Sequence, residues 1–183
     1  GEEDAGETPP PAAIEPSNIF EDGCYILADF ETDRQIRQIK YGATFGIVTP
    51  NTDPAYVTRG KQSIRCEIIG REEAWGKLKP HIWVGLDGSY FQKNNFTDCE
   101  TYLIDMYNAM DYDLPVRFCV ENTWAYKDFT LKPGWNTLEV PCDYGEFLTE
   151  EMQSGFYFYF DRGELHEQRQ IIYVDNFRAR KKS

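Results

Sequence analysis

Short runs in which apolar and polar residues alternate follow one another along most of this chain. A period of two is typical of β-strands with one buried face, and helical periodicity is almost absent. Turn-forming segments such as Lys132-Pro133-Gly134 and Asp161-Arg162-Gly163 separate the runs and can reverse the chain. The predicted strands are 63–69, 81–86, 102–107, 116–121, 127–131, 136–140, 156–160 and 171–179, after a first apolar run at 24–31.

The number and spacing of these strands predict an all-β fold, either a sandwich of two antiparallel sheets or a barrel. One short helical turn is expected at 149–155, because Thr149 is a good N-cap, acidic residues follow it and Gly155 can end the turn. We expect a single domain over residues 19–183, since a chain of this length can bury a core of its own.

Alternation also assigns the side chains of three predicted strands to two faces. Phe156, Phe158 and Phe160 fall on one face, and Tyr157 and Tyr159 fall on the other. The apolar sets of the other two strands, expected between the sheets, are Val116, Phe118 and Val120, and Tyr102, Ile104 and Met106. If all three strands belong to one sheet, its outer face carries Asp105, Tyr107, Arg117, Glu121, Tyr157 and Tyr159.

This predicted face has the composition of a sugar-binding surface. Aromatic residues make up 15% of the chain, and an aromatic ring can stack on the C–H face of a sugar while arginine and carboxylate groups bind its hydroxyls. The structural alternative is that tyrosines on an exposed sheet serve cross-strand pairing. The sequence leaves both explanations open.

Aromatic residues in predicted loops could line a cleft at one edge of the sandwich. Trp124 and Tyr126 follow the segment Glu121-Asn122-Thr123 and are the stronger candidates for contact with a ligand. Trp135 follows Pro133-Gly134 and is expected to anchor the core instead. The other aromatic residues expected in loops are Trp75, Trp83, Tyr90 and Phe91.

Charge and cysteine spacing exclude several classes of function. The net charge is −12, and the basic residues cluster only at the C-terminus, so we expect no nucleic-acid partner. The five cysteines stand too far apart for CxxC redox or zinc motifs, and their odd number leaves at least one thiol unpaired within the chain. The two histidines, His81 and His166, lie in separate segments and exclude HxH and HExxH metal sites.

Residues 1–18 are predicted to form a disordered acidic tail or linker, because they combine acidic residues with a Pro9-Pro10-Pro11 run and few large apolar side chains. No stretch approaches the roughly 20 apolar residues of a membrane-spanning helix. Since the chain begins with Gly rather than Met, we expect that an export signal has been removed.

Four segments carry recognisable motifs, at residues 27–31 (LADFE), 59–65 (RGKQSIR), 131–138 (LKPGWNTL) and 172–177 (IYVDNF). In this order they resemble the opening strand, the Gly-Lys-x-Ser run, the Pro-Gly-Trp-Asn turn and the closing strand of jelly-roll carbohydrate-binding modules and the wider galactose-binding-like sandwiches. The resemblance implies an antiparallel two-sheet β-sandwich, a jelly roll, that binds a polysaccharide or oligosaccharide without catalysis.

In that family a structural calcium often lies near the chain ends. Its ligands are an acid of the opening strand, a backbone oxygen near the Gly-Lys-x-Ser run and the Asp of the closing strand. In this chain the implied ligands are Glu31, the carbonyl of Lys61, and Asp175. Hard oxygen ligands of this kind suit Ca²⁺. The alternative is that these carboxylates only stabilise turns and strand edges.

The acidic, Pro-rich tail resembles the tether that follows the lipidated cysteine of bacterial surface lipoproteins, although that cysteine is absent here. This resemblance implies an extracytoplasmic protein, either secreted or held at the cell surface through a missing N-terminal lipid anchor. A glycan-degrading or glycan-uptake protein is the expected partner.

Two other functions stay open. A structural or adhesion domain would have the same fold and tail, but its surface should show a flat apolar patch. A glycan hydrolase or lyase would need paired carboxylates. Asp105 and Glu121 could face each other across strands, yet nothing in the sequence assigns one as acid and the other as base, so we expect no enzyme.

Overall fold

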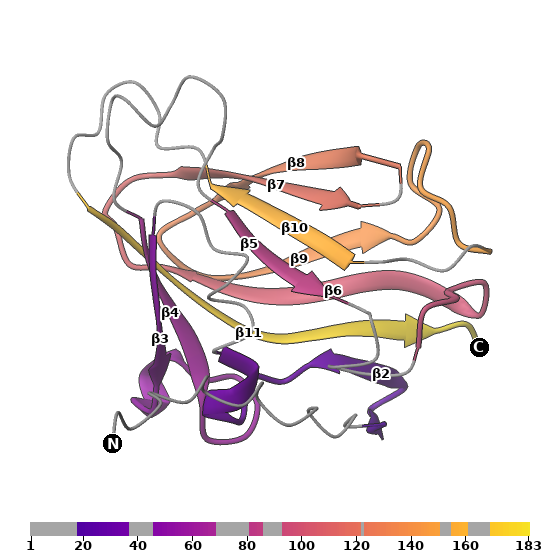
Figure 1. Cartoon of the computed structure of the whole chain (residues 1–183). Helices are drawn as coiled ribbons and strands as arrows, with labels where there is room; N and C mark the ends of the chain where they lie inside the picture. Colours follow the sequence, from indigo (N-terminus) through magenta and orange to yellow (C-terminus); the bar gives the residue numbers. More distant parts are fainter. Residues whose placement is uncertain are drawn as a thin grey trace, which may run out of the picture.

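The computed structural model describes residues 18–36, 46–68, 81–85, 93–121, 123–150, 155–160 and 169–183. Over these residues two antiparallel sheets pack against each other as a β-sandwich (Figure 1). The predicted fold class is therefore confirmed. Residues 1–17 of the predicted tail and residues 151–154 of the predicted helical turn lie outside the described residues, while Thr149 and Glu150 form a bend.

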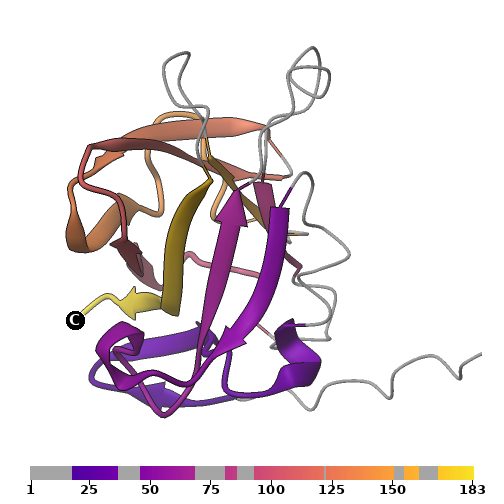
Figure 2. The same cartoon turned by 90° about the vertical axis from the view of Figure 1, so that its left-hand side faces the viewer.

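The larger sheet is organised around its last strand, which pairs with β6 along one side and with β4 and then β2 along the other. Figure 2 shows β3 beside β4, and β4 beside β11. The strands are β1 (Phe20–Glu21), β2 (Cys24–Ala28), β3 (Gly46–Asn51), β4 (Ser63–Ile68), β6 (Cys99–Asn108), β9 (Gly134–Pro141) and β11 (Gln170–Lys181).

The smaller sheet has four strands in the order β5-β10-β7-β8, each antiparallel to its neighbours. The strands are β5 (His81–Gly85), β7 (Leu114–Val120), β8 (Ala125–Leu131) and β10 (Gly155–Phe160).

Three elements were not predicted from the sequence: β1, β3 and a 3-10 turn, η1 (Pro54–Tyr56). The turn begins where the Asp53 carboxylate accepts a hydrogen bond from the N–H of Ala55. β3 contains Pro50, and a proline within a run of residues is evidence against a central strand. Proline is tolerated here because β3 pairs only with β4 among the described strands and lies at the edge of the sheet.

The core lies between the two sheets and is rich in aromatic rings. Phe118, Phe156, Phe158 and Phe177 contact one another with ring centroids between 5.0 and 6.4 Å apart. Phe160 is also buried, and Tyr157 and Tyr159 lie on the opposite face of β10, half-buried. The predicted division of this strand into two faces is therefore confirmed.

All five cysteines are buried and carry free thiols. Cys66 belongs to the core, and burial raises the pKa of its thiol to about 12. Within the described part of the chain, no helix combines the length and the hydropathy that crossing a membrane would require.

Candidate ligand-binding face

The outer face of the four-stranded sheet, called here the aromatic face, carries two rows of side chains that cross all four strands. Alternation puts them there, because their neighbours Ile82, Phe118 and Phe158 point into the core. In strand order β5-β10-β7-β8, the first row is Trp83, Tyr157, Cys119 and Tyr126, and the second is His81, Tyr159, Arg117 and Asp128.

Aromatic rings are stacked along this face. The rings of Tyr157 and Tyr159 lie 5.5 Å apart at 25°, and the ring of Trp124, from the turn before β8, lies 5.4 Å from Tyr157 at the same angle. His81 contacts both tyrosines at 5.3 and 5.2 Å. The stack ends at Trp124, which is 57% exposed, and Tyr126 adds a separate ring that is 50% exposed, so a ligand can reach both rings.

Charged groups on the same face are held in place by each other and by the rings. Arg117 donates two hydrogen bonds to Asp128, of 2.7 and 3.1 Å, and its guanidinium lies 3.7 Å from the centre of the Tyr126 ring. Glu121 accepts a hydrogen bond of 3.0 Å from Nε1 of Trp83. These groups are therefore pre-organised beside the stacked rings.

Burial raises the pKa values of Tyr157 and Tyr159, and the Glu121 carboxylate adds to both shifts. Both phenols therefore keep their protons at neutral pH and can donate as well as accept hydrogen bonds.

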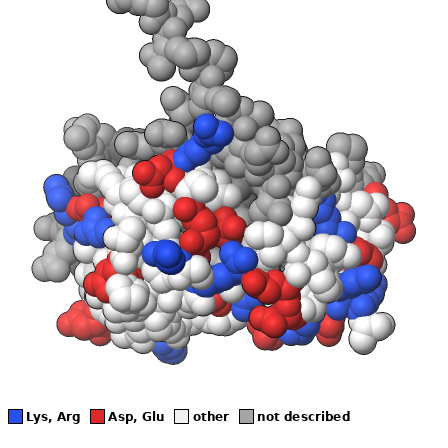
Figure 3. Space-filling view, turned by 90° about the horizontal axis from the view of Figure 1, so that it is seen from below, with Lys and Arg blue, Asp and Glu red and all other residues white. Residues whose placement is uncertain are grey.

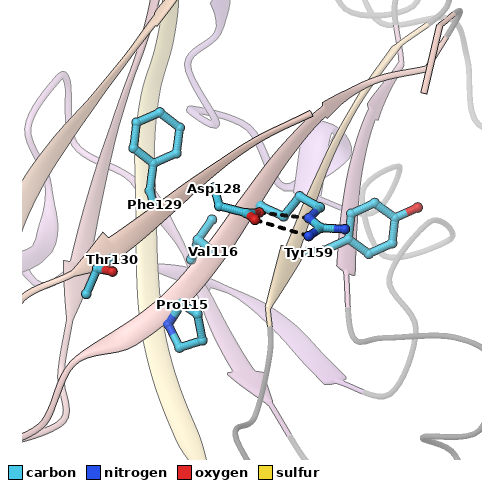
Figure 4. Close-up of a pocket in the computed structure, with 7 residues that line it drawn as sticks. Pro115, Val116, Asp128, Phe129, Thr130 and Tyr159 are labelled. Atoms are coloured by element: carbon cyan, nitrogen blue, oxygen red, sulfur yellow. Dashed lines mark hydrogen bonds and ion pairs between the residues drawn. The ribbon is translucent and has the colours of Figure 1, made fainter. Parts of the chain in front are cut away.

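A pocket of about 230 Å³ opens beside the second row. Figure 4 shows Asp128 and Tyr159 among the residues that line this pocket, with dashed lines for the ion pair of Asp128 with Arg117. The volume is below the roughly 300–1,000 Å³ of drug-sized pockets, and an open face with a small hollow suits a ligand that is held along its length. The pocket is lined by Pro115, Val116, Arg117, Asp128, Phe129, Thr130 and Tyr159.

The structure brings together six of the eight predicted ligand residues, namely Arg117, Glu121, Trp124, Tyr126, Tyr157 and Tyr159. The expectation that Asp105 and Tyr107 share this face is wrong, because β6 belongs to the larger sheet. Alternation separates the two faces of a strand but cannot say which sheet the strand joins. Because β6 and β7 belong to different sheets, Asp105 on β6 and Glu121 directly after β7 are not a facing pair.

Sequence reasoning missed His81 and Asp128, and it assigned Trp83 to a loop although Trp83 lies in β5. The signal was present, since His81 and Trp83 alternate with Ile82 and Val84 within a predicted strand. Trp135 is a further correction: it is 40% exposed on the outer side of the larger sheet and does not anchor the core. The Pro-Gly turn sets the bend of the backbone, not the direction of the next side chain.

The three residues proposed as calcium ligands lie around the segment 58–62. Both oxygens of Glu31 accept backbone hydrogen bonds, from Lys61 at 2.9 Å and Gln62 at 3.3 Å. Asp175 accepts three, from the N–H groups of Thr58, Arg59 and Asn176, at 2.8 to 3.0 Å. The two carboxylates thus hold the two ends of one loop, beside the paired strands β2 and β11.

Gly60 lies between these two anchors, with a φ of +71°. A Cβ atom at this position would collide with the Glu31 carboxylate. The glycine of the Gly-Lys-x-Ser run is therefore required by the close approach of the backbone to Glu31.

Lys61 contacts Glu31 through its backbone N–H, whereas the calcium ligand predicted at this position is the backbone carbonyl oxygen of Lys61. No group of three or more His, Cys, Asp or Glu side chains among the described residues could hold a metal ion. The carboxylates therefore already have a structural role without metal, and calcium at this position stays a prediction.

Asp175 gives the stability a pH dependence of defined sign. Burial raises its pKa from the usual 3.8 to about 7, although three backbone N–H groups favour the charged form. Between these two pH values the folded protein holds a proton that the unfolded chain has released. The stabilisation from this group is therefore complete below about pH 4 and is lost as the pH rises through about 7.

When the pH is lowered from about 7.5 to about 5, we expect the free energy of unfolding to rise more for the parent than for Asp175→Asn, which lacks the titrating carboxyl. Urea denaturation of both proteins at several pH values measures this difference. Parallel pH profiles would contradict the assigned shift.

Comparison with known proteins supports the fold but supplies no close relative. No protein-family model matches the sequence, and no curated protein matches it either. A solved structure of the family 11 carbohydrate-binding module from Clostridium thermocellum, in complex with a β-1,3-1,4-mixed-linked tetrasaccharide, is 11% identical with a TM-score of 0.53. The match covers 87% of this chain and 96% of the module.

Two further structures match parts of longer chains. SGBP-B, from a xyloglucan utilization locus in Bacteroides uniformis, is 15% identical with a TM-score of 0.51, over 86% of this chain and 49% of its own. An exo-β-agarase is 8% identical with a TM-score of 0.59, over 86% of this chain and 25% of its own.

The chain has the jelly-roll fold of the carbohydrate-binding modules. The resemblance seen in four sequence segments is thereby confirmed for the fold. Because one fold can carry many functions, the ligand must be argued from the side chains of the aromatic face.

Proposed function

We propose that this chain is a non-catalytic module that binds a polysaccharide or oligosaccharide on the aromatic face. The observation that carries this proposal is the stack of Trp124, Tyr157 and Tyr159, which runs along the face beside hydrogen-bonding groups. Stacked rings offer a long apolar surface for the C–H faces of successive sugars, and the polar groups can bind their hydroxyls. Cross-strand pairing alone does not account for Trp124, which is outside the strands and 57% exposed.

The ligand is proposed to be a neutral glycan. Arg117, the arginine of the second row, is already paired with Asp128 through two hydrogen bonds, and the whole chain carries a net charge of −12. Acidic and basic side chains are interspersed on the surface in Figure 3. Such a protein repels a polyanion at long range and has no spare cation in the rows of this face to bind one.

We also propose an extracytoplasmic role in glycan capture, by a secreted or surface-tethered protein that works beside a glycan-degrading or glycan-uptake partner. The acidic Pro-rich tail supports a tether. The occurrence of the same fold in SGBP-B and within an agarase supports a setting in which glycans are handled.

Calcium binding by Glu31, Asp175 and the Lys61 carbonyl is a separate proposal. An ion that binds only the folded state should stabilise it by about 2.7 kcal/mol at a hundredfold excess over its dissociation constant. We expect the parent to melt at a higher temperature in calcium than in chelator. Asp113→Asn, which removes a surface carboxylate paired with Lys132, should show the same difference as the parent. Equal melting temperatures would exclude the site.

Affinity electrophoresis tests the choice of a neutral ligand. We expect mixed-linkage β-glucan, xyloglucan or agarose in the gel to retard the protein, and polygalacturonate to leave its mobility unchanged relative to a non-binding reference protein. Retardation by polygalacturonate alone would contradict the proposal.

A further inference from the structure

A row of side chains that includes three aromatic rings crosses the larger sheet, on the opposite side of the sandwich from the aromatic face. Successive residues in this row are direct partners in the strand register, from β3 through β4, β11 and β6 to β9. The row consists of Thr49, Arg65, Tyr173, Tyr107 and Trp135.

The rings of this row form one connected cluster, called here the ring ladder. Tyr56, from η1, stacks on Tyr173 at 4.0 Å and 6° and meets Tyr107 edge-on at 4.9 Å. Tyr107 in turn lies 5.3 Å from Trp135. The three tyrosines are half-buried, whereas Trp135 is 40% exposed at the end of the ladder.

The loop that contributes Tyr56 is fixed to the sheet. Two residues after Tyr56, the N–H of Thr58 donates to Asp175 at 2.8 Å and its hydroxyl donates to Asp105 at 2.7 Å. Asp105 also accepts a hydrogen bond of 2.9 Å from the hydroxyl of Thr137, next to Trp135 on the same face of β9. The ladder is therefore held rigidly before any ligand arrives, which reduces the entropic cost of binding.

Charges beside the ladder are paired within the protein. The Arg65 guanidinium forms an ion pair of 3.1 Å with Glu67, and Arg169 approaches the other oxygen of Glu67 at 2.7 Å. The half-buried Thr49 and the exposed Thr137 add uncharged hydroxyls on the same side of the sheet. The surface thus repeats the construction of the aromatic face, with rings in a row and paired charges next to them.

We propose that the ring ladder is a second binding surface for a neutral glycan, with Trp135 as its exposed contact. Cross-strand pairing accounts for Tyr107 beside Tyr173, but it does not require a tryptophan exposed at the end of the row. Because the two surfaces lie on opposite sides of the sandwich, one molecule can hold two glycan segments at once. The proposal stands on the ladder itself and does not depend on the aromatic face.

Indole N–H signals in ¹H–¹⁵N NMR spectra test this directly, because Trp135 lies at the ladder and Trp83 and Trp124 at the aromatic face. Trp135→Phe and Trp124→Phe assign the signals. The probes are the mixed-linked β-glucan tetrasaccharide, a xyloglucan heptasaccharide and an agarose-derived hexasaccharide. We expect at least one probe to move the Trp135 signal with a saturating midpoint that Tyr157→Ala leaves unchanged. A Trp135 signal that stays fixed with all three probes overturns the proposal, whatever the other signals do.

Affinity electrophoresis with Trp135→Ala, Tyr157→Ala and the double variant separates the two surfaces. If the ladder binds, Tyr157→Ala retains a retardation that the double variant loses. If Trp135→Ala migrates like the parent and the double variant like Tyr157→Ala, only the aromatic face binds and the ladder proposal fails. If Tyr157→Ala migrates like the parent while Trp135→Ala loses retardation, the ladder stands and the aromatic face fails.

Discussion

Replacing Phe118 with alanine is expected to lower the free energy of unfolding by about 3–5 kcal/mol, the usual cost of truncating a buried aromatic side chain to alanine. Phe118 is fully buried at the centre of the sandwich, where its ring contacts Tyr102, Phe147, Phe156, Phe158 and Phe177. The variant would lose packing with both sheets at once. Equilibrium urea denaturation measures the loss.

Phe20→Ala is the matched control, because Phe20 is 55% exposed and contacts only Tyr25 among the ring pairs of the described residues. Its expected cost is within about 1 kcal/mol. Equal losses for the two variants would show that the aromatic core does not hold the sheets together as described.

Above about pH 7, where Asp175 is charged, Asp175→Asn is expected to destabilise the protein by about 1–3 kcal/mol, the cost of leaving a buried polar group unsatisfied. Both Asp175 oxygens accept backbone N–H groups, and an asparagine offers one oxygen and one amide group. At least one backbone N–H would then face another donor. The loop that carries Thr58 and Arg59 should loosen with it.

Asp113→Asn provides the comparison, since the Asp113 side chain is 46% exposed and pairs with Lys132 at the surface. An exposed ion pair of this kind contributes about 0–1 kcal/mol. Thermal denaturation of both variants measures the difference, and a stability of Asp175→Asn equal to that of the parent would contradict the anchoring role.

The strands and the faces of their side chains could largely be predicted from alternation, because the period of two is a local property of the chain. Phe156 and Tyr157 illustrate this, as one is buried and the other lies on the outer face. Sheet membership could not be predicted in the same way. Asp105 and Tyr107 were placed with the wrong strands because pairing depends on contacts between residues far apart in the sequence.

The candidate site was predicted in part for the same reason. Arg117 and Tyr159 are direct partners across β7 and β10, and alternation put both on an outer face. Trp83 joins them only because β5 pairs with β10, which no local pattern reveals. The exposure of Trp135 likewise depends on what covers the outer side of the larger sheet.

Isothermal titration of the parent, Tyr157→Ala and Tyr144→Ala with the most strongly retained of the three neutral glycans tests the central claim most directly. Tyr157 contacts Trp124, Tyr159 and His81 on the aromatic face, whereas Tyr144 is an exposed tyrosine whose ring contacts Phe147 and the ammonium of Lys127. Loss of a central aromatic anchor should weaken binding about 5- to 30-fold, or about 1–2 kcal/mol, while Tyr144→Ala binds like the parent. Circular dichroism should show that both variants are folded. Parent-like affinity of a folded Tyr157→Ala would contradict the aromatic face as the binding site.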